Sequence, residues 1–166
     1  MVTALGTASP AATLPVTYRC VTEEGKVESR ASSLTLPMGA MINMNGTAVY
    51  LVIAALFCAQ VFNVDLSIIQ IMVVALTALL VSIGASMVPN LSLLILGVVL
   101  YSADFPPVAY AGIGLVVLVD WLFDRLRAVV NVWSDAVGAA VVGETFEFKT
   151  ARRVTPAVSS RRGPTR

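Results

Sequence analysis

Two long stretches of this sequence, residues 31–64 and residues 66–103, contain no charged side chain. A helix needs roughly 20 apolar residues to cross the hydrocarbon core of a bilayer, so each stretch is long enough for at least one crossing. The chain has 166 residues, of which 57% are hydrophobic. A soluble core of that size could bury one such stretch, but not two together with the apolar segment at residues 105–119. The sequence therefore predicts an all-α membrane protein with lipid as its main partner.

The positive charges predict how the chain is oriented in the membrane. Lysine and arginine lie at residues 19–30, at Arg125 and Arg127, and in the tail at residues 143–166. The positive-inside rule makes the loop at residues 17–32 and the basic tail cytoplasmic. We expect a multi-pass integral protein of the plasma membrane.

The first uncharged stretch is interrupted by the polar run Asn43-Met44-Asn45-Gly46-Thr47. Broken backbone at membrane depth is tolerated only where it is buried in protein or lines a wet cavity. We therefore predict a broken transmembrane helix at residues 33–62, made of half-helices at about 33–42 and 48–62 around an unwound, ligand-facing segment. A continuous helix whose polar residues pack against neighbours is the alternative.

The second uncharged stretch is too short for two full crossings and is broken near residues 86–90, which include Pro89. Two half-depth helices that meet at this tip form a re-entrant hairpin at residues 66–103. The alternative, one tilted helix with a proline kink, leaves many apolar residues unplaced. Residues 1–16 are small and apolar with breakers at Pro10 and Pro15, and they predict a short helix or half-helix.

A polar stripe is predicted on the last helix, residues 106–142. At 100° per residue its members fall within about 80° of one another on the helical wheel, while the other faces are apolar. Ionisable groups in a membrane are costly and usually mark a pathway or a site. An internal salt-bridge network, for instance between Asp124 and Arg127, is the alternative explanation. The members are Asp120, Asp124, Arg127, Asn131, Asp135 and Gly138.

The residue types in this stripe suit a zwitterionic solute and a small cation. The planar guanidinium of Arg127 can bind a carboxylate through two hydrogen bonds, and the carboxylate of Asp124 can bind an ammonium group. Asn131 can both donate and accept hydrogen bonds. Asp135, together with Asn43 and the carbonyl groups of the unwound segment, supplies the oxygen ligands that a hard cation prefers.

Several of these motifs also resemble those of the glutamate and neutral amino-acid transporter family, the dicarboxylate/amino acid:cation symporters. Residues 43–47 resemble the family's Asn-Met-Asp-Gly-Thr signature, and residues 119–135 resemble its last membrane helix. Residues 12–17 resemble the end of its first re-entrant hairpin, and residues 82–85 with Pro89 resemble its second. The likeness runs from about Val2 to Val142 in the same order.

The resemblance implies a transport domain that moves as an elevator within each protomer of a homotrimer. It makes residues 1–16 a remnant of the first hairpin, in a C-terminal portion that lacks the family's N-terminal half. The substrate positions that it implies are Thr47, Asn131, the substrate-carboxylate ligand Arg127, the ammonium ligand Asp124 and the backbone of Val88. The sodium positions that it implies are Asn43, Met44, Asn45, Ser82, Ile83, Asn131 and Asp135.

The sequence departs from the family pattern at several of these positions. Asn45 stands where the family has an aspartate that binds a third sodium, and Leu51 stands where animal glutamate carriers have the glutamate that carries a proton. Ala128 replaces a threonine that contacts substrate, and Met87 and Ser92 replace glycines of the second hairpin tip. These changes put the sodium stoichiometry in question and predict no proton coupling through position 51.

Together these observations predict the C-terminal part of a sodium-coupled symporter for acidic amino acids or dicarboxylates, with sodium as the coupling ion rather than a prosthetic group. The alternative is a non-transporting or truncated relative: an anion conductance, a sensor or an inactive fragment. The chain contains no histidine, no cysteine–base pair and no phosphate-binding glycine loop. We therefore expect neither an enzyme nor a nucleic-acid partner.

Overall fold

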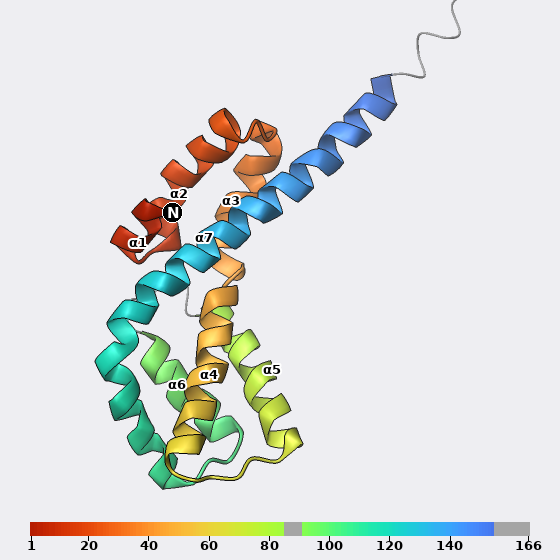
Figure 1. The fold of residues 1–166 in the computed structure, drawn as a ribbon. Coiled ribbons are helices and arrows are strands. Elements are labelled where there is room, and N and C mark those ends of the chain that lie inside the picture. The colour runs from red at the N-terminus through yellow and green to blue at the C-terminus, as the bar shows by residue number, and fades with distance from the viewer. Residues whose placement is uncertain (85–90, 155–166) are drawn as a thin grey trace, which may run out of the picture.

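The computed structural model describes the backbone of residues 1–84 and 91–154, and within these ranges the regular elements are all helical (Figure 1). The prediction of an all-α fold is therefore confirmed. In chain order the elements are α1 (Val2–Thr7), α2 (Pro10–Arg19), the π-helical turn η1 (Cys20–Glu24), α3 (Ser29–Ile42), α4 (Asn45–Val61), α5 (Ile68–Gly84), α6 (Leu91–Ser102), the 3₁₀ turn η3 (Pro107–Tyr110) and α7 (Ala111–Val154).

The long helix α7 organises the fold, since it contacts α1, α2, α3, α4 and α6. In Figure 1, α1 to α3 lie along its middle, while α4, α5 and α6 gather around its N-terminal part. Because α3 and α4 follow each other along α7, the junction between them at Asn43 and Met44 faces the centre of the long helix.

The main apolar core joins α4, α5, α6 and the start of α7. Its fully buried members include Leu51, Val74, Leu96 and Leu100. Leu51 therefore fills core space at the position where the family's proton-carrying glutamate is expected. A smaller apolar cluster of Val21, Leu36 and Ala139 joins η1, α3 and α7.

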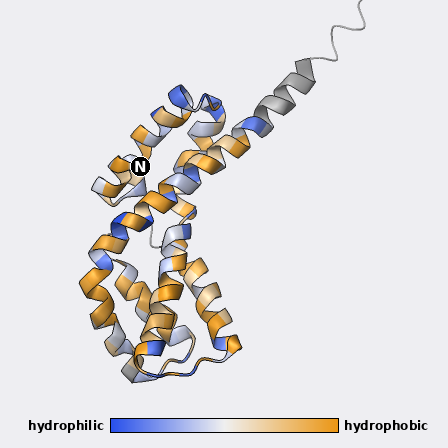
Figure 2. Ribbon diagram, viewed as in Figure 1, coloured by the Kyte–Doolittle hydropathy of each residue, from blue (hydrophilic) through white to orange (hydrophobic). Residues whose placement is uncertain are grey.

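Hydrophobic residues predominate along α4, α5 and α6 (Figure 2), and many large apolar side chains of the helices are exposed. Ile68, Leu94 and Leu118 are each more than two-thirds exposed, as expected of surfaces that meet lipid or further membrane helices. Judged by length and composition, one stretch of the described residues, Ser29–Val61, is long and apolar enough to cross a membrane.

The helix is interrupted in this stretch, over fewer residues than the sequence predicts. Asn43 and Met44 leave helical geometry, with ψ angles of 65° and 48°. The helix resumes at Asn45 rather than at residue 48, and the amide of Ala48 already bonds to the carbonyl of Met44 at 3.0 Å. The alternative of a continuous helix is therefore wrong.

The predicted loop at residues 17–32 is mostly helical, which corrects that expectation. An i,i+4 pair of Arg19 and Glu23 at 2.9 Å supports helix on this polar segment. The chain turns only at residues 25–28, where the Gly25 amide bonds to the Cys20 carbonyl and Lys26 adopts a φ of 53°.

The remaining expectations concern the two hairpins and the last helix. Residues 1–16 contain two helices, and Ser9 caps α2 through a hydrogen bond from the Ala12 amide to its Oγ. Helices α5 and α6 pack against each other, so one kinked helix over residues 66–103 is wrong; their connection at residues 85–90 lies outside the described residues. Helix α7 continues to Val154 rather than ending near residue 142, since no proline interrupts residues 143–154.

Candidate functional site

Two glycines bring the break in the α3–α4 stretch close to α7. A Cβ atom on Gly39 would lie 2.5 Å from Oδ1 of Asp135. A Cβ atom on Gly46 would lie 3.0 Å from the carbonyl oxygen of Arg127 and 3.1 Å from Oδ1 of Asn131. Both distances leave little or no room for a larger side chain, so glycine on each side of the break permits the close approach.

Most of the predicted polar stripe on α7 faces inward toward this break. Asp120, Arg127, Asn131 and Asp135 are each at least 94% buried. Asp124 is partly exposed, whereas Gly138 is exposed and has no heavy atom near its Cβ position. The inward stripe therefore ends at Asp135, one turn earlier than the helical wheel indicates.

The N-terminal half of the stripe is built around Arg127. Its Nη2 donates to Oδ1 of Asp124 at 2.8 Å, and to Oδ1 of Asp120 and Oγ of Ser92 at 3.2 Å each. Its Cζ lies 4.1 Å above the centre of the Tyr50 ring, a cation–π arrangement. The Tyr50 hydroxyl donates to Oδ1 of Asp120 at 2.6 Å. We call this group the arginine cluster: Tyr50, Ser92, Asp120, Asp124 and Arg127.

The guanidinium of Arg127 has N–H donors that the described residues do not use. Its Nε and Nη1 are buried and have no hydrogen-bond partner among the described residues. Buried donors without partners are rare, and each calls for a specific explanation. An anionic ligand that reaches Arg127 would satisfy them.

The C-terminal half of the stripe joins the break through amide and hydroxyl groups. Nδ2 of Asn43 donates to Oδ1 of Asp135 at 2.9 Å and to Oγ of Ser134 at 2.8 Å. Nδ2 of Asn45 donates to the same Ser134 Oγ at 2.9 Å. Within the described part of the chain, Asp135 has no lysine or arginine within ion-pair distance. We call this group the asparagine cluster: Asn43, Asn45, Ser134 and Asp135.

Asn131 lies between the two clusters and fastens the break to α7. Its Oδ1 accepts a hydrogen bond from the backbone amide of Gly46 at 2.8 Å, and its Nδ2 donates to Sδ of Met44 at 3.2 Å. The first bond satisfies one of the free amides at the start of α4. Both ends of the Asn131 amide therefore hold backbone or side chain of the broken segment.

The other predicted site residues lie at different distances from this centre. Thr47 is buried directly after Gly46. Ser82 is buried and donates to the Leu79 carbonyl in its own helix at 2.8 Å, while Ile83 is 40% exposed. Val88 lies outside the described residues. The structure thus brings Asn43, Asn45, Asn131 and Asp135 together at the break. Asp124 and Arg127 meet in the arginine cluster, and Thr47 is buried at the start of α4.

Sequence reasoning missed Tyr50 and Ser134 and gave Ser92 no contact with Arg127. Tyr50 lies one helical turn after Thr47, and Ser134 lies one turn after Asn131. That i,i+3 spacing is the signal that could have placed both on the faces that meet at the break. Asp120 was found as a stripe member, but its bond to Tyr50 was not foreseen.

The alternative of an internal salt-bridge network describes part of the site, since Arg127 pairs with both Asp120 and Asp124. It does not account for Asp135, for which the described residues provide no such cation. Arg125, off the stripe, has a different role. Its Nη1 donates to the carbonyls of Leu5 and Gly6 at 3.2 Å each, and so holds the end of α1.

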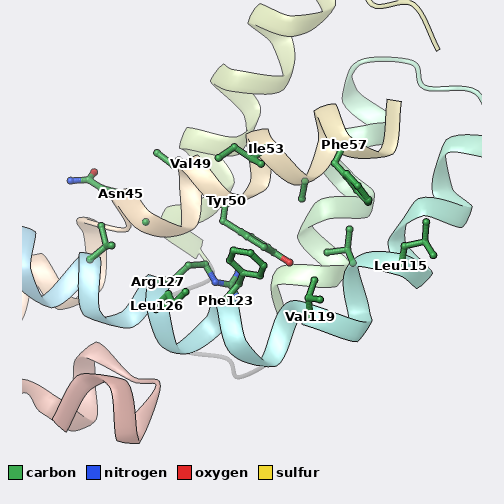
Figure 3. A pocket seen from close by; sticks show the side chains of 14 residues that line it. Asn45, Val49, Tyr50, Ile53, Phe57, Leu115, Val119, Phe123, Leu126 and Arg127 are labelled. Atoms are coloured by element: carbon green, nitrogen blue, oxygen red, sulfur yellow. The ribbon is translucent and has the colours of Figure 1, made fainter. Parts of the chain in front are cut away.

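An apolar groove of about 700 Å³ runs between α4 and α7 (Figure 3). Val49, Ile53 and Phe57 line it from α4, and Leu115 and Val119 line it from α7. Arg127, Tyr50 and Phe123 lie together at its side in Figure 3. Because the rest of the lining is almost entirely carbon, the groove offers little to a carboxylate or an ammonium group away from Arg127.

The chain is similar over most of its length to proteins of one known family. Residues 1–145 match the model of the Sodium:dicarboxylate symporter family. The chain is 46% identical over 142 residues to Excitatory amino acid transporter 1 of Ambystoma tigrinum, covering 86% of this chain and 26% of that protein. It is 48% identical over 141 residues to an Excitatory amino acid transporter of Caenorhabditis elegans, covering 85% and 27%. The human Excitatory amino acid transporter 1 is 44% identical over 142 residues, with coverage of 86% and 26%. The chain thus spans about a quarter of the length of these curated relatives.

Proposed function

The chain belongs to the sodium:dicarboxylate symporter family, and from that premise we propose that it supplies the ligand-binding part of a longer membrane carrier. The carrier couples movement of an acidic amino acid or a dicarboxylate to movement of sodium, which is a co-transported substrate. The observation that carries this proposal is the buried Arg127, whose Nε and Nη1 have no partner among the described residues.

Arg127 is the group that binds the substrate's side-chain carboxylate. Its Nη2 is already held by Asp120, Asp124 and Ser92, which fixes the plane of the guanidinium. The unused donors are therefore held in one orientation before a ligand arrives, so less side-chain entropy is lost on binding. A charge-assisted bond in this buried setting is stronger than one in water.

Asp124 is the proposed partner of the substrate's ammonium group. It is the more exposed of the two carboxylates that contact Arg127, with 36% of its side chain exposed against 6% for Asp120. A carboxylate that binds Nε and Nη1 leaves Asp124 on Nη2 through its Oδ1, and the exposed part of the Asp124 carboxylate is then available to an ammonium group. This arrangement favours an amino acid over a plain dicarboxylate.

Sodium is proposed to bind at the asparagine cluster and the unwound segment. Asp135 supplies a buried negative charge that no lysine or arginine among the described residues neutralises. The C-terminal end of α3 points its free carbonyls and its negative dipole end at the same place. Carboxylate, amide and backbone oxygens are the ligands that suit a hard cation.

A direct binding experiment tests the proposal. The purified full-length protein that contains residues 1–166 is titrated with aspartate, glutamate and succinate in sodium chloride and in choline chloride. We expect aspartate or glutamate to bind in sodium and to bind at least tenfold more weakly in choline. Arg127→Ala should abolish binding, while the matched variant Arg125→Ala, which removes a neighbouring arginine outside the cluster, should not. Absence of sodium-dependent binding of all three compounds would overturn the proposal.

A non-transporting relative is the second candidate, and Ser92 favours it. Its hydroxyl accepts from Arg127 and lies 3.4 Å from both oxygens of Asp120, so it ties α6 to α7. If this tie prevents the α5–α6 hairpin from moving, ligand binds without being transported. Uptake into proteoliposomes that appears only in Ser92→Gly would support this candidate, whereas uptake by the unmodified protein would exclude it.

We also propose an oligomeric state, a membrane location and an orientation for the carrier. We expect a homotrimer in the plasma membrane, in contact with lipid, with the basic tail on the cytoplasmic side. Chemical cross-linking in membranes and protease access to the tail from either side test these points.

A further inference from the structure

Ser134 is the only side chain in the described part of the chain that bonds to both asparagines of the broken segment. Its Oγ accepts from Nδ2 of Asn43 at 2.8 Å and from Nδ2 of Asn45 at 2.9 Å. A hydroxyl oxygen has two acceptor sites, so these two bonds occupy both. One serine on α7 thereby joins Asn43, the first residue of the break after α3, to Asn45, the first residue of α4.

Both amides have their Nδ2 toward α7, and for Asn43 the partners themselves require this orientation. Asp135 is a carboxylate and can only accept hydrogen bonds, so the end of the Asn43 amide that faces it must be the nitrogen. The second N–H of that nitrogen donates to Oγ of Ser134. For Asn45 the bond to Ser134 is the only side-chain hydrogen bond among the described residues. With their nitrogens held on α7, both amides direct their oxygens away from Ser134, and neither oxygen accepts a hydrogen bond from the described residues.

We propose that Ser134 is a positioning residue for sodium, which orients the carbonyl oxygens of Asn43 and Asn45 toward the cation. This inference rests on the proposed function and adds a residue to it. The serine does not itself bind the ion, because its lone pairs are taken by the two N–H groups. Its effect is to keep Nδ2 of Asn45 on α7, which leaves the amide oxygen at position 45 available to a cation.

A carboxamide needs such a support, and a carboxylate does not. An amide that rotates by half a turn presents N–H instead of oxygen and repels a cation. Asn43 is held by two acceptors and would keep one of them without Ser134, whereas Asn45 would keep none. The role of Ser134 is therefore exerted mostly through Asn45, and the two residues should act as one unit.

Thermal unfolding of the purified full-length protein in sodium chloride and in choline chloride, at equal ionic strength, tests this role. Stabilisation by a ligand that binds the folded state reports its affinity without any transport measurement. For Ser134→Ala we expect the half-saturating sodium concentration to rise about tenfold, the lower end of the effect of removing residues that orient metal ligands. Stability in choline should stay close to that of the unmodified protein, which shows that the variant folds.

Companion variants make the outcome specific. Ser134→Thr keeps a hydroxyl and should stay within about twofold of the unmodified protein. Asn45→Ala should weaken sodium as much as Ser134→Ala, and the double variant should be no weaker than Asn45→Ala alone, because coupled residues are not additive. Ser102→Ala removes a hydroxyl that bonds only to its own helix, and should change nothing.

Two results overturn the inference, and they differ from failure of the proposed function. If sodium stabilises the unmodified protein and Ser134→Ala equally well, or if the double variant shows additive losses, then Ser134 does not position Asn45. If sodium does not stabilise even the unmodified protein, then the proposed sodium coupling fails, and the role of Ser134 fails with it.

Discussion

Each half of the α7 stripe contains a buried aspartate, Asp120 or Asp135, but the two halves balance that charge differently. In the arginine cluster, Asp120 and Asp124 share the guanidinium of Arg127 within the chain itself. In the asparagine cluster, the one side-chain donor that Asp135 receives from the described residues is the amide N–H of Asn43. A carboxylate buried with its own cation is part of the folded protein, whereas a carboxylate buried without one is available to an ion from outside. One inward face of α7 thus carries a charge network that is balanced within the chain and, beside it, a carboxylate that no lysine or arginine of the described residues balances.

Arg127→Ala should produce the largest change, since it removes the only cation from the arginine cluster. Two carboxylates would be left at the site without a partner, and breaking a buried pair in this way typically costs about 3–5 kcal/mol of stability. Thermal unfolding in detergent in choline chloride measures the loss. A loss no larger than that of Arg19→Ala, which breaks an exposed pair, would show that the arginine cluster is not a buried charge network.

Tyr50→Phe should have the next largest effect. It deletes the hydroxyl that donates to Asp120 at 2.6 Å and keeps the ring beneath Arg127. Hydrogen bonds to charged groups contribute about 1.5–3 kcal/mol, so we expect a loss in that range on thermal unfolding. The control is Tyr101→Phe, on a tyrosine that is 79% exposed, which should leave stability unchanged. Equal effects of the two variants would remove Tyr50 from the cluster.

Gly39→Ala tests the close approach of α3 to the asparagine cluster. The added methyl group would meet the carboxylate of Asp135, and overpacking of this kind costs about 1–3 kcal/mol. It should also weaken stabilisation by sodium, because Asp135 must move away from Asn43. Gly138→Ala, on the exposed side of α7 with open space around the new methyl group, should instead gain about 0.5–1 kcal/mol. A neutral Gly39→Ala would show that the break and α7 are not in close contact.

Asn45→Asp should give the smallest effect, and it tests the asparagine cluster by strengthening its affinity for sodium. It adds a second negative charge to the cluster that lacks a cation. Asn45 is exposed, and at the dielectric constant of water a charge about 4 Å from the ion contributes roughly 1 kcal/mol, so the half-saturating sodium concentration should fall by up to about fivefold. Gln60→Glu adds the same charge at the far end of α4 and should not change it. An unchanged or weaker affinity for sodium in Asn45→Asp would contradict an ion site beside residue 45.

The main outline of the fold could be predicted from the sequence because membrane helices follow hydropathy. The uncharged stretches and the interrupting Asn43 to Thr47 segment located α3, α4, α5 and α6, and the 3.6-residue spacing of charged residues located the inward side of α7. The helices over residues 17–32 and beyond residue 142 were missed, because polar residues there indicate solvent contact without distinguishing a loop from a helix.

The candidate site was predicted less completely, for a physical reason. Periodicity finds residues that differ in polarity from their surroundings, such as Asp120, Arg127 and Asp135. It does not find a tyrosine in an apolar helix, or a serine whose importance lies in its partners. Tyr50 and Ser134 became visible only through distances between helices that are 70 and 89 or more residues apart in sequence.

The contrast between the two halves of the stripe is tested most directly by measuring Asp120→Asn and Asp135→Asn side by side, by thermal unfolding in sodium chloride and in choline chloride. Asp120→Asn should lose about 2–3 kcal/mol in both salts, because Arg127 and Tyr50 lose a charged partner. Asp135→Asn should be at least as stable as the unmodified protein in choline and should lose the stabilisation by sodium. Equal losses for both variants in choline, or an Asp135→Asn variant that sodium still stabilises, would contradict the account.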